Sequence, residues 1–142
     1  MADEHFFSNT HILLVEDDRS HREFVANILE GIGCKVMIAF NGKDALSLIE
    51  RNNKFDIILM DIEMPEMDGL EASRRIREMK RHGDMPDDTP IVAITSNSTE
   101  DIEKTCLDAG MAGMIPKHLW KPKWEPSIKE KLQEFIPKNK ER

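Results

Sequence analysis

Short apolar runs alternate along the chain with longer segments in which apolar residues recur at helical spacing. This alternation is typical of a parallel β-sheet whose strands are joined by crossover helices. Strands are predicted at residues 11–16, 35–39, 55–60, 91–95 and, in a short last run, 113–116. Each strand belongs to a β/α unit, so the pattern predicts five such units in succession.

The helical segments have recognisable starts and ends. After the first strand, apolar residues fall on one helical stripe, with Asp18 as the predicted N-cap and two glycines at the end. Ser98, with Asp101 three residues later, resembles a capping box that starts the fourth helix, which is predicted to end at Gly110. The remaining helices are predicted at about residues 42–51, 70–80 and 127–136, and the breaker-rich segment 82–90 is predicted to be a surface loop.

The 142 residues are predicted to form one doubly wound, five-stranded α/β domain. A composition of 39% hydrophobic and 33% charged residues can build a core, which excludes a disordered or fibrous protein. No repeat, low-complexity tract or linker divides residues 1–142, and no output domain is expected. In such sheets the functional crevice lies beyond the carboxyl ends of the strands, so the residues directly after each apolar run are the first candidates for chemistry.

Charge and apolar run length exclude several classes of protein. A net charge of −7 disfavours binding to nucleic acid or to an anionic membrane surface. No apolar run exceeds five residues, whereas a membrane-spanning helix needs about 20, and the acidic start does not resemble a secretory signal, so a cytoplasmic location is expected. Cys34 and Cys106 lack metal-ligand spacing and are expected to be reduced thiols. The five histidines also lack such spacing and are expected to lie on the surface or to be partly packed.

The predicted strand ends carry one set of polar side chains. These are Glu16, Asp17 and Asp18 after the first strand, Asp61 after the third, Thr95 after the fourth and Lys117 after the fifth. Two carboxylates about 4 Å apart repel by on the order of 4 kcal/mol at an effective dielectric near 20, so the cluster calls for a cation. Oxygen ligands alone favour Mg²⁺ over zinc or copper. A carboxylate nucleophile with Mg²⁺, a hydroxyl and a lysine can clamp a phosphoryl group, and the product would be an aspartyl phosphate.

Four stretches of the sequence resemble the receiver domain of two-component response regulators. They read LLVEDD at 13–18, LMDIEMPEMDG at 59–69, AIT at 93–95 and AGMAGMIPK at 109–117. The resemblance covers about residues 10–136, with short extensions at both ends. It implies a flavodoxin-like parallel sheet with the strand order 2-1-3-4-5, which the apolar pattern alone does not supply.

The resemblance also implies a role for each residue of the set. Asp61 matches the phosphoacceptor, which takes a phosphoryl group from a histidine kinase or a histidine phosphotransfer protein. Asp17, Asp61 and the backbone carbonyl of Glu63 match the Mg²⁺ ligands, with Glu16 acting through water. Thr95 matches the hydroxyl that bonds the attached phosphoryl group, and Lys117 matches its ion-pair partner. The family's phosphotransfer is self-catalysed, its dephosphorylation is slow, and the signal passes to a downstream protein target through protein contacts.

The sequence departs from the family pattern around the lysine. The family usually has proline after it, but here His118 follows Lys117, while Lys121 precedes a proline, so Lys117 and Lys121 both remain candidates. Met114 occupies the position of the aromatic switch residue that works with Thr95, and it offers a softer thioether without a hydroxyl. Trp120 and Trp124 lie among basic residues, either packed on the last helix or exposed for partner docking.

Two other functions fit parts of the sequence. The unusual Met114 and His118 region is compatible with a pseudo-receiver that is not phosphorylated and acts as a protein-binding module. A magnesium phosphohydrolase is suggested by Asp61 after a strand, but the second aspartate that such enzymes carry in the same loop is missing. The chain can also be a receiver cut from a hybrid kinase, although its ends favour a complete protein.

Overall fold

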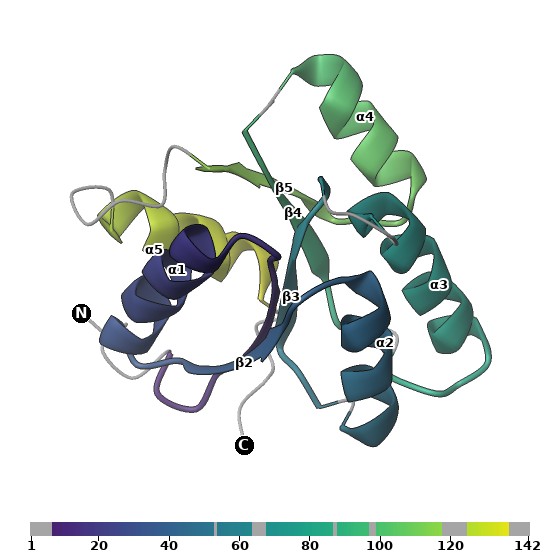
Figure 1. Ribbon diagram of the computed structural model, residues 1–142, viewed down its shortest axis with the longest axis horizontal. Helices are drawn as coiled ribbons and strands as arrows, with labels where there is room; N and C mark the ends of the chain where they lie inside the picture. Colours follow the sequence, from purple (N-terminus) through teal and green to yellow (C-terminus); the bar gives the residue numbers. More distant parts are fainter. Residues whose placement is uncertain are drawn as a thin grey trace.

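The computed structural model describes residues 7–52, 54–63, 68–86, 88–96, 99–117 and 125–136. Its centre is a parallel sheet of five strands in the order β2-β1-β3-β4-β5, as the family resemblance implied (Figure 1). The strands are β1 (His11–Val15), β2 (Lys35–Ala39), β3 (Ile57–Asp61), β4 (Ile91–Thr95) and β5 (Gly113–Pro116). Three of them have the predicted bounds, and β3 begins and ends slightly later than predicted, so that Asp61 is its last residue.

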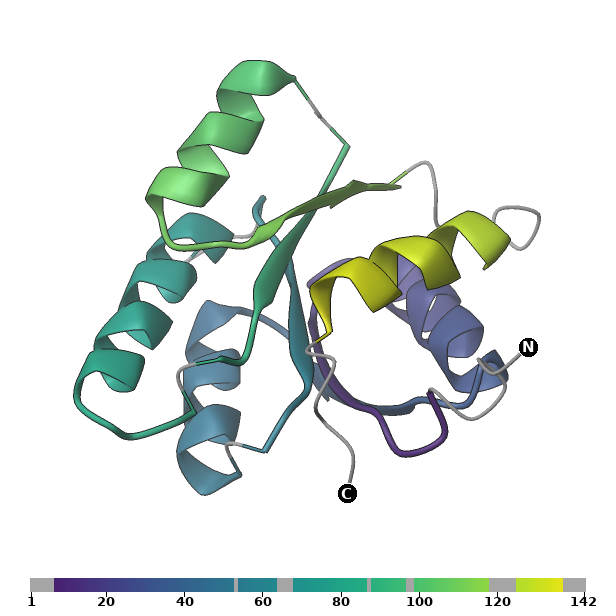
Figure 2. The same ribbon diagram turned by 180° about the vertical axis from the view of Figure 1, so that it is seen from behind.

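Helices cover both faces of the sheet, as expected for a doubly wound fold (Figures 1 and 2). Their bounds are α1 (Arg19–Gly31), α2 (Gly42–Arg51), α3 (Gly69–Arg81), α4 (Glu100–Asp108) and α5 (Glu125–Phe135). The helices α1 and α5 pack on one face through Val25, Leu29, Ile128 and Leu132. The helices α2, α3 and α4 supply Ala45, Ile49, Ala72, Ile76 and Cys106 to the core on the other face.

The middle strands of the sheet are covered by helices on both faces and separate the two core clusters. Every residue of β3 and β4 is buried, and so are the last four residues of β1. Continuous apolar runs of this kind are typical of parallel sheets. Cys34 and Cys106 are buried free thiols, as predicted. In the part of the chain that the structure describes, no helix is long and apolar enough to cross a membrane.

Helix caps agree with the sequence at one helix and differ at another. The Asp18 side chain accepts a hydrogen bond from the backbone amide of His21 at 3.0 Å, which confirms it as the N-cap of α1. The predicted capping box at the start of α4 is wrong. Thr99 is the N-cap, and its hydroxyl oxygen accepts from the Ile102 amide at 3.2 Å, while Ser98 lies outside the described residues. Serine and threonine hydroxyls can both accept from a free amide of the first turn, so adjacent serine and threonine residues are both candidates for the N-cap.

Candidate metal and phosphoryl site

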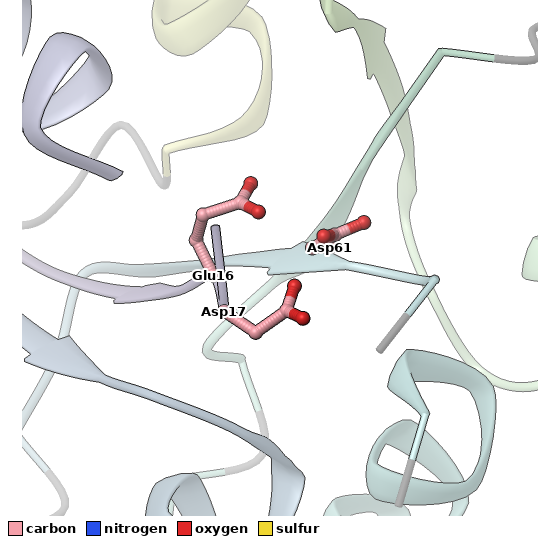
Figure 3. A group of neighbouring side chains, drawn as sticks. All are labelled: Glu16, Asp17 and Asp61. Atoms are coloured by element: carbon pink, nitrogen blue, oxygen red, sulfur yellow. The ribbon is translucent and has the colours of Figure 1, made fainter. Parts of the chain in front are cut away.

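Three carboxylates meet at the carboxyl edge of the sheet. Glu16 and Asp17 directly follow β1, and Asp61 ends β3, its neighbour in the sheet. The register, in which Val15 lies beside Met60, sets Glu16 next to Asp61 along the two strands. One oxygen from each of the three carboxylates lies within 4.8 Å of the others, and Figure 3 shows the three side chains converging. The predicted clustering of these acidic residues is therefore present in the structure.

The two strand-end carboxylates are buried and held by specific partners. Glu16 is fully buried and Asp61 is 1% exposed. The Nδ1 atom of His21 lies 2.7 Å from Glu16 Oε1, and the Asp18 amide donates to Glu16 Oε2 at 3.2 Å. The backbone amide of Glu63 donates to Asp61 Oδ1 at 3.0 Å. Asp17, in contrast, is exposed and gives the cluster an opening to solvent.

Lys117 provides the positive charge of the site. It follows β5, and its Nζ atom lies 3.5 Å from Asp61 Oδ2 and 3.9 Å from Glu16 Oε1. Its side chain is 23% exposed, which leaves the ammonium group weakly screened by water. The structure thus brings one of the two candidate lysines into the site, whereas Lys121 lies outside the described residues.

Burial and repulsion change the titration of the acidic pair. Burial is the largest cause that raises the pKa of Asp61 to about 7, followed by the hydrogen bond and the charge of Glu16, against the Glu63 amide and Lys117. Burial also raises the pKa of Glu16, but hydrogen bonds with His21 and Asp61 and the charge of Lys117 outweigh it, so this pKa is lowered. Below about pH 7, the proton of the pair therefore resides on Asp61 when no cation is bound.

The donor set fits a hard divalent cation. All side-chain ligand atoms of the cluster are carboxylate oxygens, which Mg²⁺ and Ca²⁺ prefer and which zinc and copper sites seldom consist of. With Glu16, Asp17 and Asp61 all ionised, the three carboxylates carry more negative charge than the single ammonium group of Lys117 balances. A divalent cation would relieve this repulsion and favour the ionised form of Asp61.

The other predicted residues that the structure describes lie on the neighbouring strands or directly beyond Asp61. Thr95 ends β4, beside β3, and is fully buried. Met114 in β5 is partly buried and packs against the core on the α3 side. Glu63 is exposed and lies two residues beyond Asp61. His118, Trp120 and Trp124 lie outside the described residues.

Gly69 explains how the helix after Asp61 can approach the site. A Cβ atom at this position would collide with the carbonyl oxygen of Asp61 and would lie only 2.7 Å from the Cα atom of Ile62. Both contacts are with backbone atoms, which cannot move aside easily. Only glycine allows the start of α3 to pack this closely against the end of β3.

Sequence reasoning missed the part that His21 plays. Its ring is partly packed, as predicted, but it also contacts the buried Glu16 carboxylate, and its Nε2 atom is buried without a hydrogen-bond partner among the described residues. The position of His21 along the sequence could have indicated this contact. His21 lies in the first turn of α1, directly after the acidic residues, where a side chain can point back toward the strand end.

Comparison with known proteins identifies the family. Residues 12–129 match the response regulator receiver domain family, so the chain belongs to that family. It is 36% identical over 141 residues to probable histidine kinase 4 of Oryza sativa subsp. japonica, covering 88% of this chain and 14% of that protein. It is 33% identical over 121 residues to hybrid signal transduction histidine kinase L of Dictyostelium discoideum, covering 84% of this chain and 7% of the kinase. The chain thus spans only a small part of these curated relatives.

Solved structures support the same assignment. The chemotaxis protein CheY4 of Vibrio cholerae superimposes with a TM-score of 0.76 at 26% identity, covering 89% of this chain and 98% of that one. The receiver domain of the histidine kinase CKI1 from Arabidopsis thaliana, solved in complex with Mg²⁺, superimposes with a TM-score of 0.72 at 29% identity. That comparison covers 85% of this chain and 90% of the CKI1 domain. The shared architecture is the receiver fold, and the CKI1 structure holds Mg²⁺.

Proposed function

We propose that this chain is a phosphoacceptor receiver domain. It takes a phosphoryl group from the phosphohistidine of a histidine kinase or a histidine phosphotransfer protein onto Asp61, in a Mg²⁺-dependent reaction. The single observation that carries the proposal is the meeting of buried Asp61 with Glu16, Asp17 and Lys117 at one edge of the sheet. We further propose that residues 1–142 act as one receiver unit in a phosphorelay and pass the signal to a downstream protein through protein contacts.

Asp61 supplies the nucleophile in this proposal. One carboxylate oxygen forms a bond to phosphorus while the bond between phosphorus and the histidine nitrogen breaks, and the electron pair of that bond returns to the leaving imidazole. The Glu63 amide holds Oδ1, and Lys117 faces Oδ2, so the carboxylate has a fixed orientation. Because the pKa of Asp61 is about 7 in the cation-free site, loss of its proton is a condition for attack.

The remaining residues stabilise the charge that develops on the phosphoryl oxygens. Asp17, Asp61 and the backbone carbonyl of Glu63 would hold Mg²⁺, with Glu16 acting through water. When bound, the ion supplies positive charge that neutralises phosphoryl oxygens in the transition state. The Lys117 ammonium group, already 3.5 Å from Asp61, adds a second positive charge on its side of the carboxylate.

Thr95 and Met114 form the proposed response to phosphorylation. The Thr95 hydroxyl lies at the end of β4, the strand beside β3, where it can bond the attached phosphoryl group. Met114 packs in the neighbouring strand β5, where Ala93 is its partner in the register. A flexible thioether fills a gap left by a moving threonine with less rotamer preference than an aromatic ring. This softer switch also favours the second candidate function, a pseudo-receiver that binds a partner without phosphorylation.

Intact mass spectrometry with Mg²⁺ and a small acyl-phosphate donor tests the proposal. Wild-type protein should gain one phosphoryl adduct that hydroxylamine removes, and Asp61→Asn should gain none. Asp56→Asn is the matched control, since Asp56 precedes the same strand at its opposite end, where it accepts a hydrogen bond from the His11 amide. Mg²⁺ binding without an adduct would contradict the phosphoacceptor function and support the protein-binding module.

A further inference from the structure

The backbone of the acidic pair has a donor of its own. Arg22 lies in the first turns of α1, and its Nη1 atom donates to the carbonyl oxygens of Glu16 and Asp17 at 3.2 and 3.3 Å. One guanidinium nitrogen therefore holds two successive peptide groups of the loop between β1 and α1. We call residues 16–18 the acidic loop.

Phe40 forms the surface against which Arg22 lies. The guanidinium carbon is 4.7 Å from the centroid of the Phe40 ring, a cation–π distance. Phe40 follows β2, the strand that pairs with β1, and it is 53% exposed, unusually high for a large apolar side chain. Its backbone amide donates to Asp44 Oδ2 at 2.9 Å, which ties the residue to the first turn of α2. The Phe40 backbone is thus held at the end of β2, and its ring contacts Arg22.

This arrangement matters most for Asp17. Glu16 is anchored by its amide, which donates to Ala39 O at 3.1 Å, and by the partners of its carboxylate. The Asp17 carboxylate is exposed and makes no hydrogen bond to any residue that the structure describes, although it lies in the three-carboxylate cluster. The position of its carboxylate therefore depends on the backbone of the acidic loop, where Arg22 holds the Asp17 carbonyl.

We propose that Arg22, seated on Phe40, is a positioning residue that sets the divalent-cation affinity of the site by fixing the backbone of the acidic loop. The inference rests on the proposed Mg²⁺-dependent function and deepens it. Arg22 does not touch the cation or the phosphoryl group in this proposal. It acts through the two carbonyl groups, in the way that outer partners of metal ligands commonly tune affinity.

The sign of the effect separates positioning from charge. Arg22→Ala removes a positive charge near an acidic site, and simple electrostatics would then tighten Mg²⁺ binding. Positioning predicts the opposite, about tenfold weaker binding by isothermal titration calorimetry. Arg19→Ala is the matched control, since Arg19 lies on the same helix but pairs with Glu23 instead of the acidic loop. It should tighten Mg²⁺ binding slightly, and added salt should remove that effect.

Two further variants test the Phe40 ring and the guanidinium group of Arg22. Phe40→Leu removes the cation–π partner and should weaken Mg²⁺ binding in the same direction, with an effect that does not add to that of Arg22→Ala. Arg22→Lys keeps the charge but lacks the planar guanidinium, so it should restore only part of the affinity. Once Mg²⁺ is saturating, phosphorylation by the acyl phosphate should proceed at the wild-type rate in each variant. A defect that persists there would contradict a role limited to cation affinity.

Carbonyl carbon NMR shifts measured without Mg²⁺ test the contact independently of the proposed function. The signals of Glu16 and Asp17 should move in Arg22→Ala and in Phe40→Leu, and they should stay in place in Arg19→Ala. Unmoved carbonyl signals, or Mg²⁺ binding that is unchanged or tighter in Arg22→Ala, would overturn the inference. If wild-type protein binds no Mg²⁺ while the carbonyl signals move as expected, the proposed function and the role of Arg22 in cation affinity both fail, and only the contact of Arg22 with the acidic loop stands.

Discussion

Replacing Asp61 with asparagine should stabilise the cation-free protein at pH 8. Asp61 is buried beside Glu16, and the folded protein raises its pKa from the ordinary 3.8 to about 7. Above about pH 7, the folded protein contains an ionised, buried Asp61 carboxylate, which lowers its free energy of unfolding. Asparagine has nearly the same shape, and its oxygen can still accept the hydrogen bond from the Glu63 amide, so the variant removes the charge with little change in packing.

The size of the effect follows from the pKa difference. A rise of about three pKa units, at about 1.4 kcal/mol each, corresponds to a ceiling of about 4 kcal/mol. Because the folded-state pKa lies above the unfolded value, this cost is absent below about pH 4, grows as the pH rises toward 7 and stays constant above it. The stability gap between Asp61→Asn and wild type should follow the same course.

Urea unfolding at pH 4, 6 and 8 in the presence of a chelator measures this gap. Asp56→Asn, at the other end of the same strand, should show no comparable gain at pH 8. Adding Mg²⁺ at about 100 times its dissociation constant should stabilise wild type by about 2.7 kcal/mol and Asp61→Asn by much less. Equal stability of wild type and Asp61→Asn at pH 4 and at pH 8 would refute the reasoning, since it would mean that the buried charge costs nothing.

Three other changes have defined outcomes. Lys117→Met leaves Asp61 without its cation, so the pKa of Asp61 should rise further in a carbon NMR titration and phosphorylation should slow at least tenfold, whereas Lys104→Met should change neither. Gly69→Ala should cost more than about 2 kcal/mol in urea unfolding, because the new Cβ meets backbone atoms, while Gly31→Ala, with open space around it, should cost nothing. Ser73→Ala removes the buried hydroxyl that donates to Ala109 O at 3.3 Å and should cost about 1 kcal/mol, with faster hydrogen exchange at the end of α4.

Each of these three predictions would be contradicted by a specific result. Phosphorylation at the wild-type rate in Lys117→Met would indicate that the second candidate lysine, Lys121, serves the site. A stable Gly69→Ala protein would mean that the start of α3 can move away from Asp61. Unchanged exchange in Ser73→Ala would mean that α4 is held by other contacts, such as the bond from Arg77 to Asp108 O at 2.7 Å.

Local patterns in the sequence were sufficient for most of the secondary structure. The strands at 35–39, 91–95 and 113–116 have the predicted bounds, because apolar runs between turn residues define a buried strand on their own. Asp18 caps α1 as predicted, since an N-cap bond joins residues only three apart. The predicted N-cap of α4 was wrong by one residue, because Ser98 and Thr99 are adjacent and both residue types can accept the N-cap hydrogen bond.

The candidate acidic site was also visible before the structure. Glu16, Asp17, Asp61, Thr95 and Lys117 each follow or end a predicted strand, and parallel strands bring their carboxyl ends to one edge. The strand order, however, came from the family resemblance and not from the apolar pattern. Pairing of β1 with β3 joins residues more than 40 positions apart, and local periodicity contains no information about which strands become neighbours.

Only the tertiary structure decided how the site is held and charged. The contacts of His21 with Glu16, of Arg22 with two loop carbonyls and of Lys117 with Asp61 depend on side-chain directions at distances of a few ångströms. The raised pKa of Asp61 depends on burial between neighbouring strands, which exists only after the sheet has formed. The sequence by itself therefore determined which chemical groups reach the edge of the sheet. Packing determined their distances and their charge, because both are set by atoms that are distant along the chain.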